Sequence, residues 1–341
     1  MPIIENIESN NFTLTFEINN KENNIYTSLV NAIRRTILTD IKTWCIDFPS
    51  VQYFENTSVL DNEFITNRLT LVPIRCDLEN VDYESIKIEC RKRNDEEEIM
   101  SVYVSDFVVK DKNNNIIDNN LLFPYTKIVL LQLRHQQSIA FEGTLIQGSI
   151  DEDLTSVHCP VCTCVHTFII DENKVREKTN GMTNEEKRNF NTMNAEREYI
   201  KNVGGEPGRY KMTIETIGQF DSRDLVKKSF DLLKNRLNRF INDLKVNNER
   251  IQINNGEIFE DILEISIDNE TDTLGNLISN YAGLDEDVLY SGYVIRHPLK
   301  KNILLKIKLN ENNTYEQVIQ KYEKVVQDVN SIIDTMSNEF V

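Results

Sequence analysis

Four residues that zinc commonly uses as ligands lie within one short run of this sequence. They are Cys159, Cys162, Cys164 and His166, in His158-Cys-Pro-Val-Cys-Thr-Cys-Val-His166. Thiolate and imidazole suit a tetrahedral zinc, but zinc sites usually join two ligand pairs that are well apart in sequence. On a strand, the last three residues would share one face, and reduced cysteines are common in buried strands. A zinc- or thiol-dependent enzyme therefore stays open as an alternative, and we favour a core strand without metal.

Other candidates for chemistry are weaker. His297 precedes Pro298 with no Ser, Cys or carboxylate set beside it, which favours a structural turn. Gly204-Gly205-x-x-Gly208 lacks the Gly-Lys-Ser/Thr ending of a phosphate-binding loop, so we interpret it as a flexible loop. We therefore predict no catalytic residue and no cofactor.

Two adjacent arginines, Arg34 and Arg35, are candidates for binding a protein partner. They project from a predicted helix whose apolar stripe is Leu29, Ile33 and Ile37. A guanidinium group presents a fixed fork of donors that fits carboxylates and backbone carbonyls. The alternative is a solvated helix face, and the spacing alone leaves both open.

The elements around these residues alternate between strand and helix patterns. The first half predicts strands at 12–18 and 210–217 and a long amphipathic helix at 221–244. The second half predicts strands at 258–267, 290–295 and 303–309, a helix at 273–282 and a second long amphipathic helix at 314–336. Residues 28–33 align with 273–278 at an offset of 245, which suggests two similar layers packed face to face.

The charge balance restricts the possible partners. The 341 residues include 38 Lys and Arg and 55 Asp and Glu, a net charge of −17. Residues 251–341 hold 16 acidic and 7 basic residues, or −9, which marks a separate C-terminal unit. Affinity for nucleic acids depends largely on Lys and Arg at phosphates. We therefore expect no direct sequence-specific nucleic-acid contact, and no apolar run approaches the ~20 residues of a membrane span.

Two segments carry a family resemblance. Asn31-Ala-Ile-Arg-Arg35 is followed by Asn56-Thr-Ser-Val-Leu-Asp-Asn-Glu-Phe-Ile-Thr-Asn-Arg-Leu-Thr-Leu-Val-Pro-Ile74. Together they resemble the α-like subunits of multisubunit DNA-directed RNA polymerases, as found in the eukaryotic third subunit and its archaeal counterpart. The match over 56–74 is nearly gap-free, although Asn67 stands where the family has His and Thr70 where it has Gly.

The C-terminal unit resembles the smaller α-like partner, which is the eukaryotic eleventh subunit or its archaeal counterpart. The residues concerned are Asp272-Thr-Leu-Gly-Asn-Leu277 and Gly292-Tyr-Val-Ile-Arg-His-Pro-Leu299, followed by the terminal helix. Asp272 stands where the family usually has His. The whole chain therefore resembles a fusion of the two α-like subunits, an arrangement seen in the polymerases of large DNA viruses.

The resemblance implies an α+β fold with two dimerisation modules packed as an intramolecular pseudo-heterodimer. Residues 1–55 and 206–250 would form the first module, 56–205 a mainly β insert, 251–257 a linker and 258–341 the second module. The expected interface between the modules comprises Leu29, Ile33, Leu233, Leu237, Phe240, Leu274, Asn276, Val325 and Val329.

The resemblance also implies a non-catalytic subunit that seeds polymerase assembly. The largest and second-largest subunits would bind through Asn31, Arg34, Arg35, Glu63, Phe64, Arg68 and Leu69, and small zinc-bearing subunits would bind beside them. Some members hold zinc in a four-Cys loop, but this chain has only Cys76 and Cys90 there. The implied location is the host cytoplasm and virion for a virus, and otherwise the nucleus. An acidic adaptor that uses the same fold outside a polymerase is a further alternative.

Overall fold

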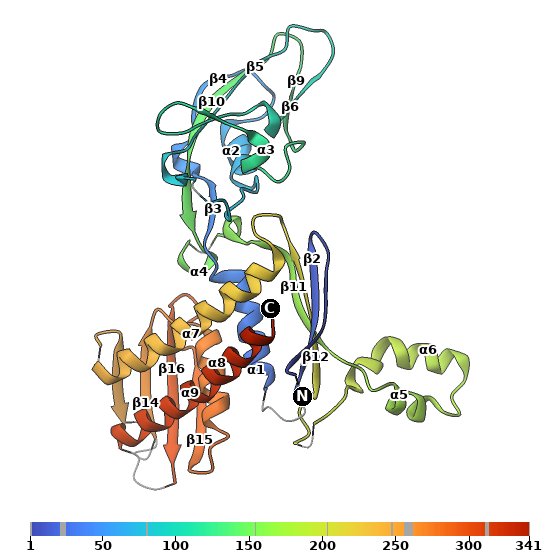
Figure 1. The fold of residues 1–341 in the computed structure, drawn as a ribbon, viewed down its shortest axis with the longest axis vertical. Helices are drawn as coiled ribbons and strands as arrows, with labels where there is room; N and C mark the ends of the chain where they lie inside the picture. Colours follow the sequence, from blue (N-terminus) through green and yellow to red (C-terminus); the bar gives the residue numbers. More distant parts are fainter. Residues whose placement is uncertain are drawn as a thin grey trace.

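The computed structural model describes residues 2–20, 25–79, 81–153, 155–202, 204–246, 248–255, 262–310 and 314–340. The molecule is elongated, with the two modules at one end and the insert at the other, and a pair of short helices projects from its side (Figure 1). Among the described residues, no helix combines the length and the apolar character that a membrane span requires.

The first module is a four-stranded antiparallel sheet with two helices on one face. Its strands follow the order β1-β2-β12-β11. The elements are β1 (Ile4–Ser9), β2 (Thr13–Asn19), α1 (Thr27–Thr39), β11 (Val161–Phe168), β12 (Arg209–Thr216) and α7 (Ser222–Val246). The helix expected at 221–244 corresponds to α7, and its whole apolar stripe is buried.

The second module repeats this plan. Its strands follow the order β13-β14-β16-β15, again antiparallel. The elements are β13 (Ile251–Asn255), β14 (Leu263–Asp268), α8 (Asp272–Ala282), β15 (Val288–Val294), β16 (Asn302–Leu309) and α9 (Tyr315–Glu339). The expected α+β class with two modules is therefore confirmed.

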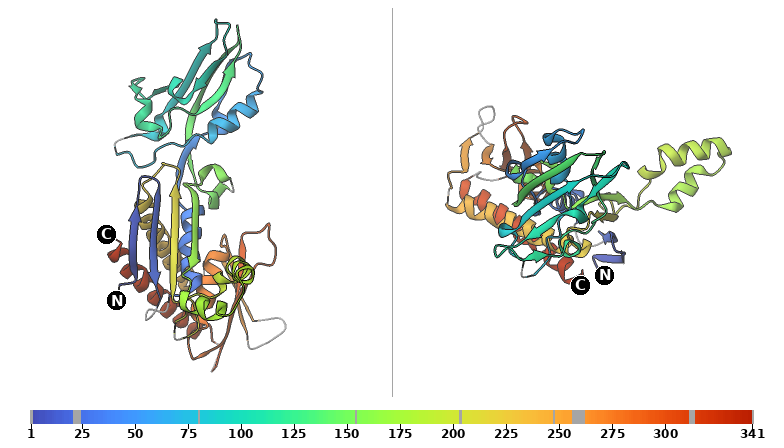
Figure 2. Two further views of the ribbon diagram at one scale, coloured as in Figure 1. Left: turned by 90° about the vertical axis from the view of Figure 1, so that its right-hand side faces the viewer. Right: turned by 90° about the horizontal axis from the view of Figure 1, so that it is seen from above.

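The helices of the two modules face each other between the two sheets (Figures 1 and 2). Buried apolar residues of both modules belong to one continuous core. Phe240 of α7 meets Tyr322 of α9 edge to face, with ring centroids 5.6 Å apart. Each buried Leu, Ile or Phe contributes about 1.5–3 kcal/mol relative to an exposed side chain. The stripe of each long helix is therefore stabilised by the other module.

The last turn of α9 reaches back across the first module. Phe340 packs edge to face on Phe16 of β2, with ring centroids 5.1 Å apart. The backbone N–H groups of Ile3 and Ile4 donate to Glu339 Oε2 at 2.6 and 2.9 Å. The start of β1 and the last turn of α9 therefore contact each other directly.

The insert is a separate β-rich layer with its own core. Five strands follow the order β3-β10-β5-β7-β8, β4 also pairs with β10, and β6 pairs with β9 in a two-stranded sheet. The elements are β3 (Thr43–Ile46), β4 (Gln52–Asn56), α2 (Asn62–Thr70), β5 (Lys87–Arg93), β6 (Met100–Tyr103), β7 (Val108–Lys110), β8 (Ile116–Ile117), α3 (Asn119–Leu122), β9 (Val129–Leu133) and β10 (Ser138–Gly148).

The remaining helices lie between β10 and β12 in the sequence. They are α4 (Ile150–Asp153), α5 (Glu172–Thr179) and α6 (Asn184–Met193). α6 begins with a capping box, in which Thr183 Oγ1 accepts from the Glu186 N–H and Glu186 accepts from the Thr183 N–H. α5 and α6 form the projecting pair in Figure 1.

The structure corrects the expected domain boundaries. Residues 161–168, assigned to an insert of 56–205, form β11 and pair with β12 of the first module. Conversely, β3 and β4, assigned to the first module, pair with β10 of the insert. Residues 251–255, expected within a linker, form β13; residues 256–257 and the start of the strand expected at 258–267 lie outside the described residues. Strand pairing between distant segments sets these boundaries, and local composition does not reveal it.

A glycine in α8 allows a close contact with the sheet of its own module. A Cβ placed on Gly275 would lie 2.5 Å from Cδ2 of Tyr293 on β15. Replacing Gly275 with alanine should therefore destabilise the protein by about 1–3 kcal/mol through overpacking, despite the higher helix propensity of alanine. Urea denaturation checks this, and a variant as stable as the wild type would contradict it.

Candidate functional site

α1 places its two arginines in different surroundings. Its apolar stripe is buried in the core, which leaves Arg34 and Arg35 half-buried beside it. Arg34 Nε donates to Asn31 Oδ1, one turn earlier, at 2.9 Å. This contact orients the Arg34 guanidinium along the surface of α1.

Arg35 instead spans the two modules. Its Nε donates to Thr273 Oγ1 of α8 at 2.8 Å. Its positive charge also acts on Tyr293, whose pKa is raised mainly by burial and further by Asp272, while Arg35 opposes the rise. Arg35 therefore contacts the second module through its Nε, and the expectation that it also faces a separate subunit stays a prediction.

α2 presents a mixed surface at the side of the insert. Phe64 is 55% exposed, and Glu63 and Arg68 are exposed on the same helix. Arg68 Nη2 donates to the carbonyl oxygen of Val129 on β9 at 2.8 Å. Leu69, expected at a partner interface, is fully buried in the core of the insert and is removed from the candidate surface.

Asn56 organises the turn that leads into α2. Its Nδ2 donates to Leu60 O at 2.9 Å and to Asn62 Oδ1 at 2.7 Å, while its Oδ1 accepts from Ser58 N at 3.0 Å. The turn therefore depends on one side-chain amide, which tends to satisfy nearby backbone groups in this way. This role was not predicted, although an Asn that opens a polar turn is a usable signal.

The expected residues of the interface between the modules lie on the four facing helices. Asn276 is half-buried, and the other eight are buried in the shared core: Leu29, Ile33, Leu233, Leu237, Phe240, Leu274, Val325 and Val329. These eight buried side chains make the centre of the interface apolar.

A buried ionic network, which sequence reasoning missed, crosses the same interface. Arg236 of α7 binds Asp40 at 2.9 Å and Glu270 of the second module at 2.8 Å, and its Nη2 donates to Thr271 Oγ1 at 3.0 Å. The side chains of Arg236 and Glu270 are only 11% and 5% exposed. Arg250 Nη2 lies 3.4 Å from the other carboxylate oxygen of Glu270, Oε1. Nothing in the local sequence distinguishes Arg236 from the solvated arginines of the same helix.

Burial and charge shift the pKa values of Asp40 and Arg236 in this network. Burial raises the pKa of Asp40, and the charge of Arg236 opposes that rise. Burial lowers the pKa of Arg236, but Glu270 and Asp40 outweigh it, so the net pKa is raised. Arg236 therefore stays charged, and both carboxylates stabilise its buried charge.

The four candidate zinc ligands do not come together. A bulge in β11 at Cys162 shifts the pairing with β12, so Cys162 is exposed while Cys164 is buried. The prediction that Cys162 shares one face of the strand with Cys164 and His166 is therefore wrong. Cys164 Sγ donates to Arg34 O at 3.8 Å, and Cys159 Sγ donates to Val161 O at 3.2 Å. Within the described ranges, no three His, Cys, Asp or Glu side chains are grouped so that they could hold a metal ion.

The protonation of these groups also disfavours a thiolate site. Burial raises the pKa of Cys164 to about 12, although the Arg34 charge opposes it, and burial also raises the pKa of Cys159. Burial and the Arg34 charge lower the pKa of His166. Since metals and electrophiles react with the thiolate, the buried thiols are poor ligands and poor nucleophiles.

We expect only the exposed Cys162 to react rapidly with iodoacetamide in the folded protein. Cys164 should react at least about tenfold more slowly, because it is buried and protonated. Peptide mass mapping of alkylation against time measures both, and metal analysis should show no stoichiometric zinc. About one zinc per chain, lost on Cys162→Ser and Cys164→Ser, would contradict this and support the enzyme alternative.

Comparisons with known proteins agree with this architecture. Residues 21–237 and residues 262–339 each match the RNA polymerase Rpb3/Rpb11 dimerisation domain. The chain is 24% identical over 282 residues to DNA-directed RNA polymerase subunit Rpo3 of Archaeoglobus fulgidus, covering 72% of this chain and 100% of that protein.

Two further relatives carry related names. Subunit Rpo3 of Methanocaldococcus jannaschii is 26% identical over 223 residues, covering 64% of this chain and 86% of that protein. DNA-directed RNA polymerase II subunit rpb3 of Dictyostelium discoideum is 37% identical over 81 residues, which is 24% of each chain. The chain therefore belongs to the RNA polymerase Rpb3/Rpb11 dimerisation family, as an α-like polymerase subunit in which two such modules are fused.

Proposed function

We propose that this chain is the non-catalytic platform on which the two large subunits of a DNA-directed RNA polymerase assemble. One observation carries the proposal: both halves match the same dimerisation family and share a single hydrophobic core. The dimer of modules is therefore complete within one chain. Covalent linkage also keeps the modules at an effective concentration of the order of mM.

The surfaces proposed for the large subunits lie outside that core. They comprise Asn31 and Arg34 on α1 and Glu63, Phe64 and Arg68 on α2. An exposed aromatic beside an arginine is the kind of anchor on which binding energy concentrates. Small zinc-bearing subunits are proposed to bind beside these surfaces.

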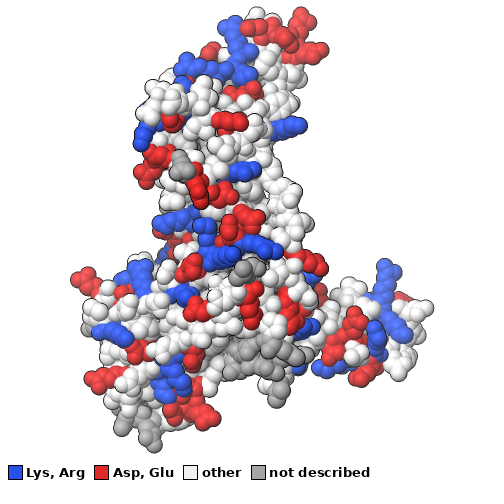
Figure 3. All heavy atoms as spheres, in the orientation of Figure 1, with Lys and Arg blue, Asp and Glu red and all other residues white. Residues whose placement is uncertain are grey.

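The charge distribution supports a role away from the nucleic acid. The face seen in Figure 3 carries interspersed acidic and basic side chains rather than an extended basic surface. The net charge of −17 also opposes binding to a polyanion. Nucleotidyl transfer by a metal pair is therefore proposed to reside in the large subunits, and this chain is proposed to act wherever that polymerase works, in the nucleus or the cytoplasm.

The test is affinity purification of the tagged full chain from cells that produce it, followed by mass spectrometry. We expect the largest and second-largest polymerase subunits in near-stoichiometric amounts. Recovery of other proteins without these two subunits would overturn the proposal and favour an adaptor.

A further inference from the structure

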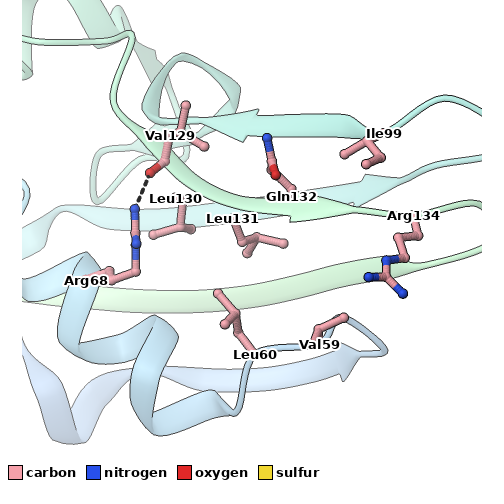
Figure 4. Close-up of a pocket in the computed structure, with 9 residues that line it drawn as sticks. All are labelled: Val59, Leu60, Arg68, Ile99, Val129, Leu130, Leu131, Gln132 and Arg134. Carbon is pink, nitrogen blue, oxygen red and sulfur yellow. Dashed lines mark hydrogen bonds between the residues drawn. The ribbon is translucent and has the colours of Figure 1, made fainter.

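A groove of about 390 Å³ separates β9 from the turn that precedes α2. Leu60 and Val59 lie on one side of it, and Leu131 lies opposite (Figure 4). Arg68 and Arg134 lie toward its two ends. The groove is therefore apolar at its centre and positively charged toward its ends.

β9, the strand beside the groove, lies at the edge of a two-stranded sheet. In the part of the chain that the structure describes, β9 pairs with β6 and with no other strand. Arg68 already binds one backbone carbonyl of β9, that of Val129, at 2.8 Å. Unpaired backbone groups at the edge of a sheet can pair with an added extended segment, and neighbouring pockets then select its side chains.

Exposure and charge indicate what would bind there. Val59 is 69% exposed and Ile99 is 62% exposed, so both rims of the groove present apolar surface to water. The lining includes two arginines and no carboxylate, in a chain of net charge −17. Guanidinium groups bind carboxylates in a paired, directional way. The groove therefore complements a segment that is apolar in its middle and acidic toward its ends.

We propose that an extended segment of a partner polymerase subunit, apolar at its centre and carrying carboxylates toward both ends, lies in this groove along β9. The proposal rests on the proposed function, since it takes the partner from the polymerase. It adds the conformation and the chemistry of the bound segment.

The experiment compares variants of the full chain in reconstitution with the two large subunits. Ile99→Asp and Arg134→Glu change exposed groove residues, so the fold should persist. Ile116→Asp on β8, where Ile116 is 74% exposed, and Arg176→Glu on α5 are matched controls outside the groove. We expect association to weaken about tenfold or more for each groove variant and to be unchanged for the controls.

Hydrogen exchange supplies a second measurement on the wild-type chain. The backbone amides of residues 129–133 should exchange more slowly in the assembled complex than in the free chain. Unchanged exchange together with wild-type assembly of both groove variants would overturn this inference and leave the proposed function intact.

Two other outcomes show whether the proposed function fails as well, or only this inference. Failure of the wild-type chain to bind the large subunits would overturn the proposed function and this inference together. Self-association of the free chain that Ile99→Asp abolishes would overturn the inference in favour of a second copy in the groove.

Discussion

Replacement of Arg236 with leucine should lower the free energy of unfolding by about 3–5 kcal/mol. The change removes the guanidinium that joins Asp40 and Glu270, in a site where Glu270 is 5% exposed, and among the described residues it leaves Glu270 with only Arg250, at 3.4 Å. An uncompensated buried carboxylate is far less stable than an exposed one. The expected loss is large because Arg236 joins the two modules at a point that water barely reaches.

The measurement is urea denaturation of the full chain, followed by tryptophan fluorescence and circular dichroism. Arg239 provides the control, because it lies on the same helix, is 63% exposed and is 3.8 Å from Asp243. Arg239→Leu should change stability by less than about 1 kcal/mol. Adding Glu270→Gln to Arg236→Leu should recover part of the loss. Equal effects of Arg236→Leu and Arg239→Leu would contradict a structural role for the network.

Charge reversal at Arg34 should weaken binding to the large subunits while preserving the fold. Arg34 is half-buried beside the core and contacts Asn31 through its side chain, so Arg34→Glu removes no buried ion pair described in the structure. At an interface that uses the arginine to bind a carboxylate or carbonyls, the reversed charge should weaken association at least about tenfold.

The two arginines can now be tested separately. Arg35→Glu should reduce stability, because Arg35 binds Thr273 across the two modules. Arg176→Glu, at a 75% exposed position on α5, is the charge-matched control for Arg34→Glu. Co-purification measures binding, and circular dichroism measures the fold. Retained co-purification of the Arg34→Glu variant would remove Arg34 from the interface.

Periodicity predicted the elements that bury a continuous apolar stripe. α7 and α9 were predicted almost to their ends, because seven or more apolar residues at helical spacing require a covering surface. The resemblance over residues 56–74 indicated the family, and the two dimerisation-domain matches agree with it.

Features that depend on distant segments could not be predicted in this way. The assignment of β11 to the first module depends on its pairing with β12, which follows only after α5 and α6 in the chain. The bulge at Cys162 leaves Cys162 exposed and Cys164 buried, where simple alternation would place both on one face. Arg35 and Arg236 acquire their roles only when the second module packs against the first.

Sedimentation of reconstituted mixtures tests directly whether this chain nucleates polymerase assembly. The two large subunits, mixed without this chain, should sediment as separate species. Adding the full chain should produce one faster complex that contains all three proteins. Assembly of the large subunits to the same extent without the chain would contradict the claim.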